Sequence, residues 1–291
     1  MTAATASSNS MDRRSVLRRA SSVAAARPSI AFAAVVISFW VVVMFTVQWW
    51  APFDPYAEAG PRLQPPNSEF WFGTDELGRD LFTRVMYGAR ESLPIAFAVM
   101  VASVTIGTVL GAMAGFFGGW LDAVVMRLAD VLMAFPALLL AMVVSVGLGP
   151  GPRNAGIAVV IVWWPFYARL VRGQVLSIRS REHVEAAVTI GAGRRRVLGR
   201  HVLPLASTPI MVSATSDIGQ VVIVMSSLSF LGLGTAPPVP EWGALITSGA
   251  KFFFQWWLAA APGLAILSVV VGFNFLGDGL RDLFDRRSAA R

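Results

Sequence analysis

Residues 182–204 read EHVEAAVTIGAGRRRVLGRHVLP and lie between two long apolar stretches. They occupy most of a polar connector, 174–205, which is too long for a simple turn between packed helices. Gly191 and Gly193 allow the chain to turn sharply within it. Residues spaced at i, i+3, i+4 and i+7 predict a short amphipathic helix with one small, apolar face: Val184, Ala187, Val188 and Gly191. From the residues alone, this helix either docks into a groove on a cytosolic partner or lies on anionic lipid.

The composition around this connector is that of a membrane protein. Hydrophobic residues make up 55% of the 291 positions, charged residues 14%, and the mean hydropathy is +0.63. Soluble domains carry about 25% charged residues, so most of this chain cannot face water. Apolar segments long enough to cross a bilayer predict an all-α bundle of six transmembrane helices, at 30–50, 93–116, 125–147, 155–171, 206–233 and 256–276.

The first apolar run is too long for a typical signal-peptide core, and no small-x-small cleavage site follows it. It therefore predicts a retained helix. The expected organisation is a cytosolic tail at 1–28, a first transmembrane helix at 29–51, an extracytoplasmic loop at 52–92, a five-helix core at 93–278 that contains the connector, and a cytosolic tail at 279–291.

The basic residues set the expected orientation. With the N-terminus inside, 18 of the 24 fall in cytosolic segments, as the positive-inside rule requires. Both termini are therefore expected in the cytoplasm. The net charge of +7 does not indicate nucleic-acid binding, because the arginines lie between apolar stretches and form no single stripe.

Several kinds of site chemistry are excluded. The chain has no cysteine, and its two histidines, His183 and His201, lack the spacing of a metal site. It contains no GxxxxGK followed by Ser or Thr, and no GxSxG. No catalytic residue, cofactor or metal is therefore expected in this chain.

Small residues and prolines predict how the helices pack. Gly107, Gly111 and Gly115 recur every four residues and predict a close helix contact. Four prolines within apolar segments are expected to interrupt or bend their helices: Pro136, Pro165, Pro209 and Pro262.

Charged residues inside the spans are candidate functional sites, since a carboxylate at mid-bilayer is costly. Asp217 lies within the fifth span and either lines a pathway, meeting the cationic end of a peptide, or bonds to a partner subunit. Arg127 and Asp130 are three residues apart and predict a structural ion pair, in preference to a substrate role. The segment GTDELGRD (73–80) predicts an ordered loop.

Several strings of this sequence, in order, resemble one family. Glu185-Ala186-Ala187, then Gly191 and later Leu203-Pro204, resemble the EAA loop of ABC importer permeases. Longer strings resemble the C-type permease of the dipeptide, oligopeptide and nickel branch, which has the type I ABC importer (MetI-like) permease fold. They are FGTDELGRDLFTRVMYGAR (72–90), GGWLDAVVMRLADVLMAFPALLLA (118–141), SFLGLGTAPPVPEWGALI (229–246) and FNFLGDGLRDLFD (273–285).

The resemblance implies a non-catalytic permease subunit in a bacterial inner membrane. It implies a homologous second permease, two ABC ATPase subunits that use ATP and Mg²⁺, and an extracytoplasmic substrate-binding protein. The EAA residues would couple this chain to an ATPase: Glu185, Ala186, Ala187, Gly191, Leu203 and Pro204. Di- or oligopeptides are the expected substrate. Nickel or another small solute, or an ion-coupled secondary transporter, are the alternatives.

Overall fold

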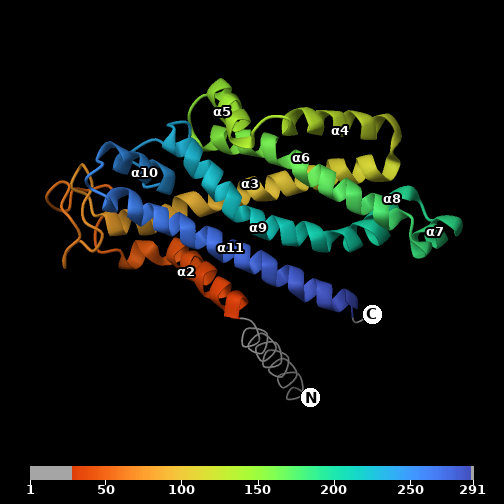
Figure 1. Cartoon of the computed structure of the whole chain (residues 1–291), viewed down its shortest axis with the longest axis horizontal. Coiled ribbons are helices and arrows are strands. Elements are labelled where there is room, and N and C mark those ends of the chain that lie inside the picture. The colour runs from red at the N-terminus through yellow and green to blue at the C-terminus, as the bar shows by residue number, and fades with distance from the viewer. Residues whose placement is uncertain (1–27, 290–291) are drawn as a thin grey trace, which may run out of the picture.

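The chain folds into an elongated helical bundle in a computed structural model that describes residues 28–289, with side chains to 284 (Figure 1). The predicted N-terminal tail, apart from Pro28, lies outside the described residues. No strand occurs among those residues. The helices are α2 (Pro28–Trp50), α3 (Leu81–Phe117), α4 (Gly119–Met133), α5 (Ala137–Leu148), α6 (Pro152–Arg179), α7 (Glu182–Thr189), α8 (Arg194–Val197), η1 (Leu198–Val202), α9 (Leu203–Phe230), α10 (Trp242–Lys251) and α11 (Trp257–Ala289).

Within this range, five helical stretches are long and apolar enough to cross a membrane, and the bent pair α4–α5 makes a sixth. The two helices of that pair meet at 96°. Pro136 lies at the break, because it lacks an N–H and disfavours helical geometry in the residue before it. The expected single span at 125–147 is therefore two helices. Pro165, Pro209 and Pro262 lie inside helices that continue past them, so these prolines do not divide their segments into separate helices.

The predicted glycine contact is confirmed as the seam between α3 and α6. A Cβ added at Gly107 or Gly111 would overlap the backbone of α6, around Trp164 and Ala168. A Cβ at Gly115 would lie 3.0 Å from the carbonyl oxygen of Arg172. Only a hydrogen atom fits at these positions, so the two helix backbones approach closely and gain dispersion contacts.

Helix α2 lies on the outside of the bundle, beside α11 (Figure 1). Trp40 is buried there, and its indole nitrogen donates to the Ser268 hydroxyl at 2.8 Å. Helix α11 also packs on α9, where Gly219 faces Val270. The bundle thus has α3, α6 and α9 at its centre and α2 at its edge.

Helix α3 begins earlier than expected, at Leu81, and so takes in the last part of the predicted 52–92 loop. The carboxylate of Asp80 caps the helix by accepting a hydrogen bond from the Thr83 N–H at 2.8 Å. Burial raises the pKa of Asp80, and its hydrogen bonds with Thr83 partly oppose that rise. The remaining irregular segment covers one end of the bundle together with α10 (Figure 1).

Candidate functional site

The predicted helix in the 174–205 connector exists as α7, at the end of the bundle opposite the 52–80 segment (Figure 1). Glu182 and Glu185 lie in its first turn, where negative charge stabilises a helix N-terminus. Val184 is only 2% exposed and packs into the main apolar core, as does Ala187. The apolar side of α7 is therefore used largely against its own bundle.

A different face of α7 points away from the protein. Glu185, Ala186 and Val188 are exposed, and Ile190, just beyond the helix, is 86% exposed. The four residues predicted to form one docking face are therefore divided: Val184 and Ala187 face inward, whereas Val188 and Gly191 are exposed. The reason is that the connector folds back on α6 and must bury part of its own apolar side.

Gly191 ends α7 in a left-handed turn with a φ of +86°. The Ala192 N–H donates to the Ala187 carbonyl at 3.0 Å, and the Gly191 N–H donates to the Val188 carbonyl at 3.0 Å. This is the Schellman arrangement, in which glycine is favoured because it has no Cβ. A Cβ at Gly191 would meet nothing within 4 Å, so the backbone angle is what calls for glycine at this position.

The chain after Gly191 leads directly into the bundle. Val197 and Val202 are buried, and α8, η1 and α9 follow one another without a break. Leu203 and Pro204 form the first turn of α9, where a missing N–H is tolerated. At the other side of the connector, the Arg179 guanidinium donates to the Gly115 carbonyl at 3.0 Å. Helix α7 thus contacts α6 directly and is joined to α9 through α8 and η1.

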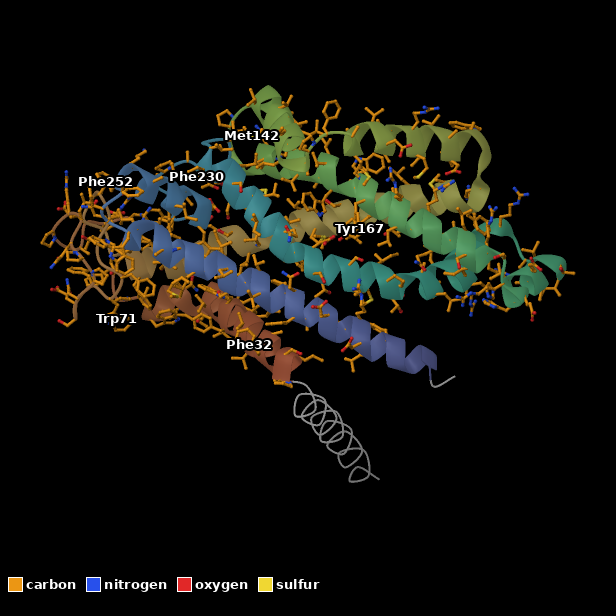
Figure 2. All side chains as sticks on the ribbon, in the orientation of Figure 1. Phe32, Trp71, Met142, Tyr167, Phe230 and Phe252 are labelled. Atoms are coloured by element: carbon orange, nitrogen blue, oxygen red, sulfur yellow. The ribbon has the colours of Figure 1, made fainter. Side chains whose placement is uncertain are left out.

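Asp217 is half-buried in α9 and accepts a hydrogen bond from the Tyr167 hydroxyl at 2.6 Å. Tyr167 belongs to α6, is fully buried near the middle of the bundle (Figure 2) and packs against Gly107 of α3. This contact joins the three central helices. Tyr167 was not among the residues predicted to form a site. The available signal was that it is the one tyrosine of three that falls in a predicted span.

The predicted Arg127–Asp130 pair differs from the arrangement found. Asp130 accepts a hydrogen bond from Arg169 of α6, and Arg127 is exposed. One turn nearer the α3–α4 corner, Arg172 of α6 bonds both carboxylate oxygens of Asp122, at 2.6 Å for Nη2–Oδ2. Helical spacing brought Arg127 near Asp130, but α4 packs along α6, which presents arginines to both aspartates.

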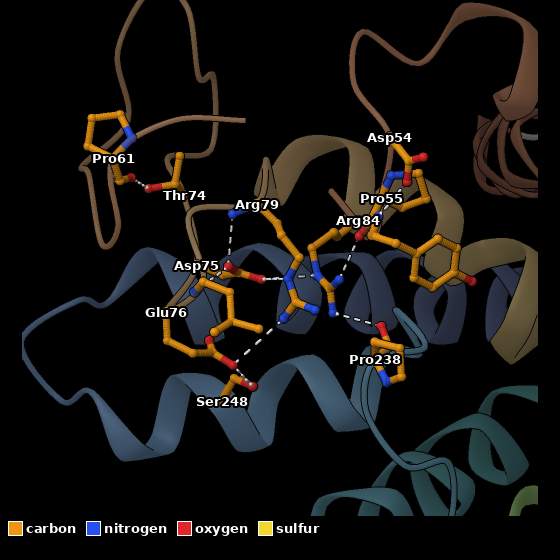
Figure 3. Close-up of polar contacts among 12 residues, drawn as sticks. Asp54, Pro55, Pro61, Thr74, Asp75, Glu76, Arg79, Arg84, Pro238 and Ser248 are labelled. Atoms are coloured by element: carbon orange, nitrogen blue, oxygen red, sulfur yellow. Dashed lines mark hydrogen bonds and ion pairs between the residues drawn. The ribbon is translucent and has the colours of Figure 1, made fainter. Parts of the chain in front are cut away.

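The segment GTDELGRD orders the opposite end of the molecule, as predicted (Figure 3). Asp75 is buried and pairs with Arg79 at 2.7 Å, and the Arg84 Nε lies 3.3 Å from the same carboxylate oxygen. Arg84 also donates to the carbonyls of Pro55, at 2.7 Å, and Pro238, at 3.3 Å. These contacts fasten the 52–80 segment to α3 and to the segment before α10. We call Asp75, Arg79 and Arg84 the cap cluster.

The cap cluster has the composition of an ion-pair network. No group of three or more His, Cys, Asp or Glu side chains with metal-site geometry occurs in the described part of the chain. The neighbouring Glu241 is likewise structural: it caps α10 by accepting from the Ala244 N–H at 3.0 Å.

These features define a multi-pass membrane protein with a short, partly exposed helix at one end and an ordered irregular cap at the other. The chain belongs to the family described as binding-protein-dependent transport system inner membrane component, which matches residues 107–289. It is therefore a permease subunit of an ABC importer, in the branch that includes peptide and nickel permeases, and ATP hydrolysis falls to partner ATPases.

Three relatives illustrate the range of this branch. The "Probable D,D-dipeptide transport system permease protein" of Escherichia coli K12 is 41% identical, covering 91% of this chain and 89% of the relative. The dipeptide transport system permease protein of Alkalihalophilus pseudofirmus is 42% identical, over 86% and 83%. The nickel transport system permease protein of Escherichia coli K12 is 39% identical, over 89% and 94%.

Proposed function

We propose that this chain and a homologous second permease form a translocation pathway for di- or oligopeptides. Two ABC ATPase subunits bind ATP and Mg²⁺ and drive the pathway between two states. An extracytoplasmic binding protein delivers the substrate to the end that carries the cap cluster. Both termini and α7 lie in the cytoplasm, a position supported by the distribution of basic residues.

The observation that carries this proposal is the exposed face of α7, formed by Glu185, Ala186 and Val188. A small, mixed apolar and acidic face suits insertion into a groove of a partner. Because α7 contacts α6 and is joined to α9 through α8 and η1, a force on this face would act on both helices. For coupling to exist, the ATPase must bind α7 with different free energies in the two transport states.

The natural absence of cysteine provides a direct test. Val188→Cys is expected to form a crosslink to an ATPase subunit when the assembled complex is treated with a short bifunctional maleimide. Phe253→Cys is the matched control, because Phe253 is also exposed but lies in the loop after α10, at the other end of the molecule. A crosslink from Phe253→Cys but none from Val188→Cys would contradict the proposed docking face.

Peptides are the proposed substrate because relatives of this chain transport dipeptides, according to their names. The nickel relative, with similar identity and coverage, makes nickel the second candidate. Affinity purification of the complex from its native membrane, with identification of the accompanying binding protein and its ligand, tests this point. Recovery of a receptor that holds Ni²⁺ would replace peptide by nickel.

Asp217 is proposed to act at the pathway or at the contact with the second permease. Its half-buried carboxylate has one partner, Tyr167, among the described residues, and one oxygen is left to accept another donor. A peptide ammonium group or a donor from the second permease would satisfy it. Asp217→Asn removes the charge but keeps the shape. Unchanged uptake at every substrate concentration, with an intact complex, would argue against both roles.

A further inference from the structure

An apolar cavity of about 370 Å³ lies in the crevice between α2 and α3. Helices α9 and α11 also contribute to its walls. Its lining is formed by aliphatic and aromatic side chains, which include Met44, Phe45, Leu93, Phe97, Ile218 and Phe273. Phe45 and Phe97 are more than half exposed, so the cavity opens toward the surroundings of the bundle.

Two polar residues lie one helical turn beyond this cavity, on the side of the cap. Gln48 follows Phe45 by three residues on α2, and Arg90 precedes Leu93 by three on α3. Residues three apart share a helix face. The Arg90 guanidinium donates to the Gln48 side-chain oxygen at 2.6 Å, so these residues bridge the two helices at the mouth of the cavity.

The positive charge of Arg90 favours an anionic ligand. Its hydrogen-bond partner in the described part of the chain is a neutral amide, and the residue is exposed. The exposed indoles of Trp49 and Trp50 directly follow Gln48, which is typical of the membrane–water boundary. A guanidinium has five donors, and its planar fork matches a phosphate. A cation at the boundary with an apolar cavity just beneath it is complementary to a phosphate that carries an acyl chain.

We propose that this crevice binds one phospholipid from the leaflet on the side of the cap cluster. Its phosphate contacts Arg90, and one acyl chain fills the cavity between α2 and α3. A charged substrate does not suit a cavity lined by apolar side chains. The acyl chain would contact Ile218, the neighbour of Asp217 on α9. Occupancy would therefore support the packing of α9 against α11.

The test uses the purified importer complex in nanodiscs that contain phosphatidylglycerol with a diazirine in its acyl chain. After irradiation, mass spectrometry locates the labelled peptides. Labelling is expected at 37–45 and 93–97. Arg90→Gln should lower it by about tenfold, the loss that accompanies removal of a charge-assisted hydrogen bond. Arg62→Gln is the matched control, because Arg62 is exposed in the 52–80 segment.

Two further arms keep the proposal falsifiable. Met44→Trp narrows the acyl-chain cavity without changing Arg90, and should also lower labelling in a complex that retains its assembly and thermal stability. A diazirine-labelled diacylglycerol, which lacks phosphate, should label weakly. Labelling spread evenly over lipid-facing helices and unchanged by Arg90→Gln would overturn the proposal. So would equal labelling by both lipids, or protection of the crevice by the second permease. None of these results depends on transport or on its substrate.

Discussion

Gly191 holds a backbone conformation that few side chains tolerate, and its role differs from that of the exposed α7 residues beside it. Its φ of +86° closes the Schellman turn after α7. A residue with a Cβ costs about 1–2 kcal/mol in this region, whereas Asn is favoured over most other non-glycine residues. The positive backbone φ angle restricts the residue type at position 191 more than the available space does.

Gly191→Val is therefore expected to misplace α7 and uncouple ATP hydrolysis from uptake, whereas Gly191→Asn should retain most coupling. The measurement is substrate-stimulated ATPase activity of the reconstituted complex, with unstimulated activity as the reference. Equal loss in both variants would point to a direct contact of Gly191 with the ATPase. Normal stimulation in Gly191→Val would defeat its assignment to the coupling element altogether.

Gly111 is restricted by space, because a methyl group there would overlap the backbone at Ala168. Gly111→Ala is expected to destabilise the bundle by about 1–3 kcal/mol, the usual cost of overpacking. Gly263→Ala is the matched control, since a Cβ at Gly263 meets nothing within 4 Å. The two apparent melting temperatures in detergent should differ by several degrees. Since Ala has a higher helix propensity than Gly, an equal fall in both variants would show that close packing at the seam does not govern the effect.

At the scale of elements, the sequence predicted contacts that the residue pattern of a single helix reveals. It missed contacts that depend on how two helices lie against each other. The Gly107–Gly115 spacing identified the α3–α6 seam because small residues on one face have few other uses in a membrane helix. The inward side of α7 and the partner of Asp130 could not be obtained in this way. Both depend on how α7 and α4 lie along α6, which local periodicity does not encode. Pro136 was predicted to bend its segment, but the 96° angle was not.

The contact between α6 and α9 through Tyr167 and Asp217 leads to a prediction about coupling between helices. Tyr167→Phe removes the hydroxyl and leaves the carboxylate without its partner in the bundle, at a cost of about 1–3 kcal/mol. If Asp217 acts mainly through this bond, Tyr167→Phe and Asp217→Asn should be non-additive in uptake rate. Uptake by the double variant would then match that of the more severe single variant.

Additive losses would instead assign Asp217 a second role, toward the pathway or the second permease. Phe166→Leu provides a control for changes in the aromatic packing of α6. It lies next to Tyr167 but is exposed. Its uptake rate should remain close to that of the wild type.

At the scale of the whole molecule, the exposed face of α7 and the cap cluster lie at opposite ends of the bundle (Figure 1). The long helices α3, α6 and α9 connect them through the glycine seam and the Tyr167–Asp217 contact. Coupling over such a distance requires an element with two arrangements whose balance is shifted from both ends. If these helices form that element, a substitution at the cap end should impair the response to the binding protein without abolishing the contact of α7 with the ATPase.

Asp75→Asn tests the cap end. It leaves Arg84 buried without its carboxylate and Arg79 with only the longer contact to Glu76, at 3.8 Å, and breaking a buried pair costs about 3–5 kcal/mol. The loss should loosen the 52–80 segment locally, because that segment lies at the end of the bundle opposite α7. In the assembled complex, the crosslink from Val188→Cys to the ATPase should persist, while stimulation of ATP hydrolysis by the loaded binding protein should fall.

Glu69→Gln, an exposed change in the same segment, should alter neither readout. Simultaneous loss of the crosslink would mean that the cap cluster supports the entire bundle, and the two ends would then not be independent.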